Sequence, residues 1–335
     1  MGRPSGIQYN YSDNIDVLKP SYPLWYFAAL SGQASLIEQE LDMLESGKYN
    51  NSDEFRLLPL ILCYALEYGN MQNGDNSQRA SQLYFGEGDT PIVAVQAPLQ
   101  GAYMAAKGGR PVNPHSHLDG GSFVYDYHSK AWVVDLNRQD YETLEAVAKE
   151  LGGDIWDMSK GSLRWDLLRL NNNGHSTITI NGSKHEVKGK ATLVSPFDGG
   201  ENKGGTFDLS GLFEGQAARV LRQIVLNADG SLVISDTVAA LDSVEASVKW
   251  NLVTPASVRV LDDGISLEID GEQMSMRTDS SYPVRYCTFS SDPSDYPSSV
   301  SSMEEKNPGI TFCGFESVVP KGKTAVFTTV LKPVR

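Results

Sequence analysis

Between positions 20 and 70, apolar residues recur with the spacing of amphipathic helices. This spacing predicts helices at 22–30, 35–46 and 58–68. Pro23 lies at the start of the first helix, and a capping box that opens at Ser35 starts the second. Each predicted helix is followed by a glycine, the residue that most often ends a helix: Gly32, Gly47 and Gly69.

Beyond residue 91 the pattern changes to the short, β-rich runs of strands. Such runs occupy 91–96, 101–106, 122–127 and 131–135. Later runs are separated by dipeptides that favour tight hairpin turns, namely Asn181-Gly182, Asp229-Gly230, Asp263-Gly264 and Asp270-Gly271. Roughly ten or more antiparallel strands in this region predict a large β-sandwich.

Alternation is clearest near residue 250, where apolar and polar side chains take turns. Val248, Trp250 and Leu252 alternate with Lys249 and Asn251, which predicts a strand with one face in water. The glycine-rich segment 199–205 and the serine-rich segment 290–302 are predicted to be surface loops.

The two patterns divide the chain into two parts. Residues 1–80 are predicted to form a short α-helical array, and residues 81–335 an antiparallel β-sandwich. The segment 70–81 is rich in Asn, Gln and Gly and is predicted to link them. The expected fold class is therefore α+β and multidomain.

Composition excludes several classes of function. The net charge of −14 argues against nucleic-acid binding, and a polyanionic ligand would require a local basic cleft or a metal. No apolar run is long enough to span a membrane, and the N-terminus lacks the apolar part of a signal peptide. The cysteines are expected to pack as small apolar residues, although Cys287 and Cys313 could pair if their strands adjoin.

Polar chemistry is concentrated at 113–121, which contains two of the five histidines, His115 and His117. On an extended segment their imidazoles point to one face and can reach one ion. Asp135 closes a predicted strand and His175 opens another. These side-chain types suit zinc, with a spare imidazole beside the metal for proton transfer. The alternative is a set of unconnected polar residues near loops.

Other polar residues have weaker claims. His128 and His185 are predicted to lie at the surface. Asp119 would extend the histidine pair to an HxHxD cluster, but Asp-Gly-Gly is also turn chemistry, which is the interpretation we favour. Arg164 beside Trp165 suits carboxylate or sugar binding, and it equally suits packing at a domain boundary.

Three blocks of the sequence, 113–123, 132–136 and 174–178, together resemble the heparinase II/III-like polysaccharide lyases. Upstream, Tyr-Asn-Tyr-Ser-Asp at 9–13 is similar to a motif late in the helical domain of that family. The resemblance covers recognisable blocks up to residue 182. After that it rests on the β-sandwich character alone.

The resemblance implies an (α/α) toroid followed by a β-sandwich, with the active cleft between them. His115 matches the catalytic histidine of the family, and His117, Asp135 and His175 match its zinc ligands. The implied reaction is β-elimination in an acidic, uronic-acid-containing polysaccharide such as a glycosaminoglycan or alginate. In that reaction a base removes the C5 proton, and an acid, commonly a tyrosine, protonates the leaving oxygen.

The same resemblance suggests where the substrate binds and where the protein acts. Tyr11, Asn113 and Arg164 are the expected substrate-binding residues. The expected location is periplasmic or secreted.

The helical part departs from the pattern of the family. Its three helices are too few to close a toroid, and neither the catalytic tyrosine nor the carboxylate-binding residue of the family finds a match. An exposed apolar patch is therefore expected on the helices, covered by a partner chain or by a further N-terminal segment. Little or no elimination is expected from residues 1–335 alone, because no acid is assigned.

Two other functions fit parts of the pattern. One is a non-catalytic glycan-binding or scaffold module, which suits the short helical part and the acidic net charge. The other is a cupin-like metalloenzyme, because cupins also combine an HxH pair with a later histidine. Cupins usually place a glutamate shortly after that pair, whereas here the first one is Glu142.

Overall fold

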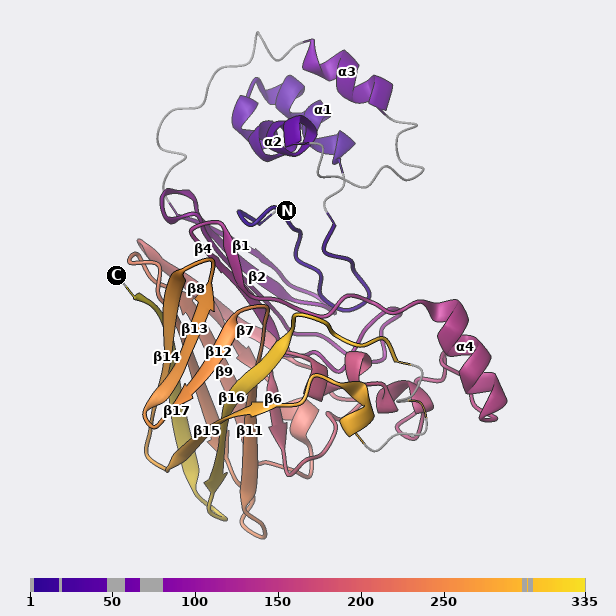
Figure 1. Ribbon diagram of the computed structural model, residues 1–335, viewed down its shortest axis with the longest axis vertical. Helices are drawn as coiled ribbons and strands as arrows, with labels where there is room; N and C mark the ends of the chain where they lie inside the picture. The colour runs from indigo at the N-terminus through magenta and orange to yellow at the C-terminus, as the bar shows by residue number, and fades with distance from the viewer. Residues whose placement is uncertain are drawn as a thin grey trace.

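The computed structural model describes residues 3–17, 20–46, 58–66, 81–296, 300 and 304–334. Helices occupy the N-terminal part of these residues and antiparallel strands most of the remainder (Figure 1). The predicted α+β fold class is confirmed. Among the helices in these ranges, none is both long and apolar enough to cross a membrane.

The N-terminal part contains α1 (Tyr22–Ser31), a 3-10 turn (Ala34–Ile37), α2 (Glu38–Ser46) and α3 (Leu58–Ala65). Gly32 ends α1 with a left-handed φ of 69°, a conformation that favours glycine. A small core of its own holds this part together, centred on Trp25, Ala28, Ile37 and Ile61. The predicted stops at Gly47 and Gly69, and the predicted linker apart from Ser81, lie outside the described residues.

Large apolar side chains are exposed on these helices, as the short helical array predicts. They come from α1, from the 3-10 turn, and from α3 and its end: Tyr26, Phe27, Leu30, Leu36, Leu60, Leu62 and Leu66. A partner chain or a further N-terminal segment that covers them stays a prediction.

The strands form three sheets in which all neighbouring strands pair antiparallel. The five-stranded sheet contains, in spatial order, β1 (Gln82–Gly86), β2 (Ile92–Ala97), β3 (Ala102–Lys107), β4 (Phe123–Tyr127) and β5 (Lys130–Val133). The eight-stranded sheet has the order β12 (Ser257–Leu261), β13 (Gly264–Ile269), β14 (Glu272–Ser280), β17 (Thr324–Val334), β10 (Leu232–Ala239), β9 (Arg219–Leu226), β8 (Asn202–Asp208) and β7 (Thr192–Gly199). The four-stranded sheet has the order β15 (Val284–Phe289), β16 (Thr311–Val319), β11 (Ala246–Thr254) and β6 (Ile178–Ile180).

Helical structure also occurs between the strands. After β5 comes α4 (Tyr141–Glu150), whose first turn is capped by the Asp140 carboxylate through the backbone N–H of Thr143. Short 3-10 turns connect other elements: Pro98–Gln100, Leu163–Asp166, Leu168–Leu170, Asn172–Gly174, Ser210–Phe213 and Pro293–Asp295.

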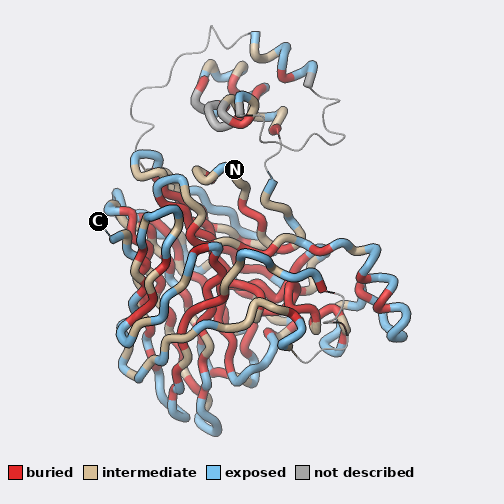
Figure 2. Tube along the Cα trace, in the orientation of Figure 1, coloured by how far each residue is buried: buried red, intermediate tan, exposed pale blue. Residues whose placement is uncertain are grey.

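One continuous hydrophobic core lies between the inner faces of the sheets (Figure 2). Met104 comes from the five-stranded sheet, Ile234 and Phe327 from the eight-stranded sheet, and Trp250 and Phe315 from the four-stranded sheet. The burial of β9 and β10 alternates residue by residue, because successive side chains of a strand point to opposite faces. The predicted β-sandwich is thus confirmed.

Several local predictions are wrong. The segment 199–205 is not a loop, because it forms the turn and the facing ends of the paired strands β7 and β8. Asn251 does not face water but is buried. Cys287 and Cys313 stay free although β15 and β16 adjoin, since Cys313 lies opposite Thr288.

The Asx-Gly turns behave in two ways. Asp270-Gly271 joins the paired strands β13 and β14, and both residues have positive φ, at 49° and 80°. Asn181-Gly182 has the same backbone signs but follows β6, which pairs with β11 instead of the next strand. The same backbone turn therefore forms a hairpin only where the strands that flank it pair with each other.

A fully buried ion pair lies on the inner face of the eight-stranded sheet. Arg222 on β9 and Asp236 on β10 are direct cross-strand partners, joined by two hydrogen bonds of 2.7 and 2.9 Å. The remaining guanidinium nitrogen donates to the carbonyls of Gly121 at 2.7 Å and Ser176 at 3.2 Å. Trp250 Nε1 donates to the same carboxylate at 2.7 Å. All three guanidinium nitrogens and both carboxylate oxygens of the pair thus have a partner inside the core.

Removing one member of this pair is expected to destabilise the protein strongly. Asp236→Asn or Arg222→Leu should each lower the free energy of unfolding by about 3–5 kcal/mol, because the other charge stays buried without its partner. The measurement is urea denaturation. Asp263→Ala, which breaks the exposed pair of Asp263 with Arg277, is the control and should cost under about 1 kcal/mol. Equal losses in the buried and the exposed variants would contradict the expectation.

Candidate active site around His115 and His117

The HxH pair lies in the loop between β3 and β4. His115 has a φ of 62°, in the left-handed region that non-glycine residues rarely adopt. Its neighbour His117 is buried, whereas 67% of the His115 side chain is exposed. The loop is therefore not the extended segment that would place both imidazoles on one ion. His115 faces solvent and His117 faces the interior.

Asp13, from the N-terminal segment, connects the two histidines. His115 Nδ1 lies 3.0 Å from Asp13 Oδ2, and His117 Nε2 lies 2.8 Å from Oδ1. The hydroxyl of Tyr141, the first residue of α4, donates to the same Oδ2. Burial would raise the pKa of Asp13, but the hydrogen bonds from His117 and Tyr141 and the charge of Arg164 lower it overall. Asp13 is therefore an ionised acceptor that collects three donors.

His117 is a neutral imidazole with a defined tautomer. Burial lowers its pKa, which keeps the ring uncharged at neutral pH despite the nearby carboxylates. Because Asp13 is ionised and only accepts, His117 Nε2 carries the proton and donates it. The other nitrogen, Nδ1, is buried, has no hydrogen-bond partner and presents a lone pair.

His175 and Asp135 lie on the interior side of this histidine. His175 Nδ1 donates to Asp135 Oδ1 at 2.8 Å, which leaves His175 Nε2 and Asp135 Oδ2 buried and without partners. Burial opposes the charged form of His175, but the Asp135 carboxylate more than offsets this effect and raises its pKa. Asn251 fixes the backbone of this segment, because its amide donates to the His175 carbonyl at 3.0 Å.

His117 Nδ1, His175 Nε2 and Asp135 Oδ2 are buried without a partner among the described residues, and all three are acceptors that suit a cation when the His175 ring is neutral. The ring centres of His117 and His175 lie 5.4 Å apart. Imidazoles that share a tetrahedral zinc, each with a nitrogen about 2.0–2.1 Å from the metal, have ring centres about 5 Å apart. Within the described residues, however, no three His, Cys, Asp or Glu side chains already form a metal-binding group. The residue types suit zinc, and zinc itself stays a proposal.

The predicted substrate-binding residues differ in their surroundings. Arg164 is completely buried and donates to the Ser116 carbonyl at 3.0 Å and to the Tyr141 hydroxyl at 3.4 Å. These contacts favour the packing interpretation over direct substrate binding. Asn113 is half-buried and begins the HxH loop, and its carbonyl accepts from Ser116 N at 3.1 Å. Tyr11 is also half-buried, with the Lys107 ammonium 5.6 Å from its ring centre.

Asp119 follows the turn interpretation. Its carbonyl accepts from the backbone N–H of Ser122 at 3.0 Å. The carboxylate is buried, but it pairs with Lys107 and accepts from the Ser12 hydroxyl at 2.8 Å, so it does not extend the histidine pair. Although burial would raise the pKa of Asp119, the Lys107 charge holds it well below the usual value. This cluster fastens the N-terminal segment to the HxH loop.

The other two histidines differ from each other. His128 is exposed as predicted, and its Nδ1 lies 3.1 Å from Glu272. The surface prediction for His185 is wrong, because its ring is buried and Nε2 lies 2.9 Å from the Ile178 carbonyl. The turn at Asn181-Gly182 leads the chain back inward. Burial lowers the pKa of His185 to about 4.

Three residues of this neighbourhood were not assigned from the sequence: Asp13, Tyr141 and Trp156. The Trp156 ring lies edge-on to His115, at 6.3 Å between ring centres and 82° between planes. A signal for Tyr141 exists, because Asp140 is a good N-cap and Leu144, Val147 and Ala148 recur at helical spacing after it. For Asp13 the sequence offers only its place in the 9–13 motif.

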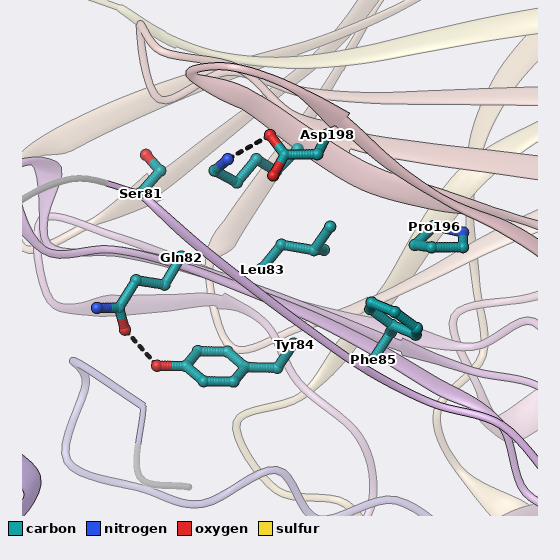
Figure 3. Close-up of a pocket in the computed structure, with 8 residues that line it drawn as sticks. Ser81, Gln82, Leu83, Tyr84, Phe85, Pro196 and Asp198 are labelled. Carbon is teal, nitrogen blue, oxygen red and sulfur yellow. Dashed lines mark hydrogen bonds and ion pairs between the residues drawn. The ribbon is translucent and has the colours of Figure 1, made fainter.

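A groove of about 570 Å³ lies elsewhere, between β1 and the β7–β8 hairpin. Tyr84 and Phe85 project from β1, and Pro196 and Asp198 come from β7 (Figure 3). No residue of the HxH neighbourhood lines this groove. The chemistry of the histidine cluster and this surface hollow are therefore separate features.

The comparison with solved structures identifies the fold. A heparinase III gene product aligns with a TM-score of 0.60 at 14% identity, over 99% of this chain and 44% of its own. Heparan sulfate lyase HepC from Pedobacter heparinus aligns with a TM-score of 0.53 at 13% identity, over 98% of this chain and 44% of its own. This chain has a heparinase III fold. No protein-family model and no curated protein matches the sequence.

The heparinase III fold thus extends over nearly the whole chain, while the chain spans 44% of the length of those structures. At these identities the likeness shows the fold alone. Which of the described side chains act, and on what, has to be argued from the site itself.

The buried His185 predicts a pH dependence of stability in this heparinase III-fold chain. Its folded pKa of about 4 lies below the unfolded value, so the unfolded chain binds more protons between these two values. Stability should therefore fall with falling pH through this window, by about 2 kcal/mol between about pH 7 and pH 5. Urea denaturation of His185→Gln at both pH values should show a decrease in stability that is smaller by this amount. His128→Gln, at an exposed position, should show the same decrease as wild type. An identical pH dependence in wild type and His185→Gln would contradict the assignment.

Proposed function

We propose that this chain belongs to a polysaccharide lyase that cleaves an acidic, uronic-acid-containing glycan by β-elimination. One observation carries the proposal: the exposed His115 and the hydroxyl of Tyr141 both bond to the buried carboxylate of Asp13. The same carboxylate also bonds to His117, a buried histidine of the kind that binds metals. The heparinase III fold supports it. Elimination at a uronate requires a base and an acid next to each other, and this cluster contains both types of group.

His115 is the proposed base. Asp13 accepts from Nδ1, so the neutral ring presents its lone pair at Nε2. The side chain is largely exposed, so a glycan can reach it. The carboxylate fixes the tautomer and stabilises the imidazolium that forms when the C5 proton is taken up.

Tyr141 is the proposed acid. Burial, followed by the hydrogen bond to Asp13, raises its pKa to about 12, so the hydroxyl keeps its proton at neutral pH. Arg164 donates to the same hydroxyl and packs 5.8 Å from the ring centre, which fixes its position. From the sequence alone no acid is assigned and little elimination is expected. With Tyr141 beside His115, we propose a measurable rate for residues 1–335.

Zinc is the proposed metal, with His117, Asp135 and His175 as its ligands. His117 Nδ1 and His175 Nε2 are the nitrogens free to bind it, and Asp135, which accepts from His175 Nδ1, would have to turn to reach the same ion. Both nitrogens are buried and have no hydrogen-bond partner among the described residues. When bound, zinc would hold the loop of His117 to the segments of Asp135 and His175 and so shape the site. Asp13 then serves as the outer partner that fixes the tautomer of a metal-binding histidine.

Substrate contacts are proposed for Asn113 and Tyr11. Asn113 is half-buried at the start of the HxH loop, and its amide suits a uronate carboxylate. Tyr11 lies beside Lys107 on the N-terminal segment that also carries Asp13. A periplasmic or secreted location is proposed with the lyase activity, because such glycans are extracellular.

Of the other functions considered, one remains and one is excluded. A non-catalytic glycan-binding module fits the same exposed His115 and is separated from a lyase by the assay below. The cupin-like alternative is wrong, because the described strands form open five-, eight- and four-stranded sheets and not a barrel.

The metal assignment predicts about one zinc per chain, because one set of three ligands is present. His117→Ala should lose the metal and lower the melting temperature, since the loop is then no longer tied to the interior. His115→Ala is the matched control and should keep the metal, because His115 faces away from the three acceptors. Elemental analysis after reconstitution decides. An absence of zinc in wild type, or its loss in His115→Ala, would contradict the ligand set.

The lyase assignment predicts a rise in the ultraviolet absorbance of unsaturated uronate when the zinc-loaded chain meets a panel of acidic glycans. His115→Ala should abolish the rise, and Tyr141→Phe should slow it by about 100-fold or more, the usual contribution of one acid–base group. His128→Gln is the control and should retain the full rate. Binding of the glycans without any absorbance change would favour the non-catalytic module.

A further inference from the structure

Trp156 is exposed, unlike every other tryptophan of the chain. Its exposed fraction is 40%, whereas the other four of the five tryptophans are at most 1% exposed: Trp25, Trp132, Trp165 and Trp250. An indole costs free energy to leave in water, so a single exposed one beside a candidate site requires an explanation.

The ring of Trp156 is held in place from several sides. Its Nε1 donates to the Glu145 carboxylate at 2.7 Å, and its backbone N–H donates to Asp154 at 2.8 Å. The Tyr141 ring packs against it at 4.6 Å between ring centres, and the Arg164 guanidinium lies 6.0 Å from its ring centre. A ligand that binds an already fixed ring loses little conformational entropy.

The ring is also in the right place for a glycan. His115 lies beside it with 6.3 Å between ring centres, and both side chains are exposed. The C–H groups on one face of a pyranose form an apolar surface that packs well on an aromatic ring. A sugar that offers its C5 proton to His115 therefore has a neighbour within reach of the indole.

The charges around Trp156 restrict which sugar that neighbour can be. The carboxylates of Glu145 and Asp154 both contact the residue. The Arg164 guanidinium, 6.0 Å from the ring centre, is buried and donates to the Ser116 carbonyl. A second carboxylate placed on the indole would be repelled by two like charges, whereas an uncharged or amine-bearing sugar would not.

We propose that Trp156 is a stacking platform for the sugar next to the reacting uronate. We further propose that this sugar is one without a carboxylate, such as a hexosamine. This inference rests on the proposed function and narrows the class of glycan substrates. It favours glycans in which uronate and hexosamine alternate over polymers such as alginate, in which every residue is a uronate.

Fluorescence quenching by acrylamide tests the platform directly, because Trp156 is the one tryptophan that a quencher can reach. The test requires His115→Gln protein, in which the proposed base is absent and the saccharide is not consumed. An unsulfated tetrasaccharide of alternating uronate and hexosamine should protect the fluorescence from quenching. A tetrasaccharide of uronates alone, at the same concentration, should not. Equal protection by both, or protection by neither, would overturn the proposal.

Variants provide a second measurement. Trp156→Leu should weaken binding of the alternating tetrasaccharide by about tenfold, and Trp156→Phe, which keeps an aromatic face, should weaken it much less. Phe85→Leu removes an exposed aromatic ring from the separate groove on β1 and is the matched control, expected to bind like wild type. Unchanged affinity in Trp156→Leu would contradict the platform.

The outcomes also separate this inference from the lyase assignment. Protection of Trp156 in a chain whose wild type eliminates nothing would keep the platform and reject the lyase. Elimination by wild type that is equally fast in Trp156→Leu, without protection of the fluorescence, would keep the lyase and reject the platform.

Discussion

The buried pair of Arg222 and Asp236 is the interaction on which the site depends. Two charges enter a core of aromatic and aliphatic side chains, at a desolvation cost that the pair offsets only through its complete set of hydrogen bonds. The same guanidinium holds the carbonyl of Gly121, at the end of the HxH loop, and the carbonyl of Ser176, next to His175. One arginine in the middle of a sheet thereby sets the distance between the two loops that carry the buried histidines.

The N-terminal segment, residues 3–17, packs on the sandwich and supplies Asp13 to the candidate site. Arg3 forms a buried pair with Asp126, and Ser12 joins the pair of Lys107 and Asp119. Between these two anchors the segment crosses one face of the five-stranded sheet, where Tyr9 packs. Asp13 follows directly and reaches both histidines of the loop. The neighbourhood of His115 is thus a product of two structural layers, a rigid sandwich and a strap of extended chain fastened over it.

Much of the architecture follows from local signals in the sequence. The glycine at 32 and the paired positive-φ residues at 270 and 271 have backbone conformations that their residue types favour, so these ends and turns are predictable. The burial of Asn251 and His185 is not predictable in this way. The partner of Asn251, the His175 carbonyl, lies 76 positions away, and the partner of His185, the Ile178 carbonyl, lies on the other side of the turn at 181–182. A strand pattern carries no information about either partner.

The candidate site shows the same division. The side chains of His117, Asp135 and His175 are chemically conspicuous, and the family resemblance groups them. Asp13 is not conspicuous, because an aspartate in an irregular segment has no periodicity and its partners lie more than a hundred positions away. Arg164 misleads for a related reason: beside a tryptophan it looks like a ligand-binding pair, yet burial makes it a support for Ser116 and Tyr141.

The strap has a consequence for how the protein is made. Asp13 leaves the ribosome before Tyr141, its partner on α4, which lies 128 positions later. At about 5–20 residues per second, the strap waits on the order of ten seconds for the surface on which it docks. During translation this segment is therefore made before the surface on which it docks. A nascent chain contains the histidines of the loop before it contains an assembled site. The candidate site therefore forms only when the segments that build it have folded together.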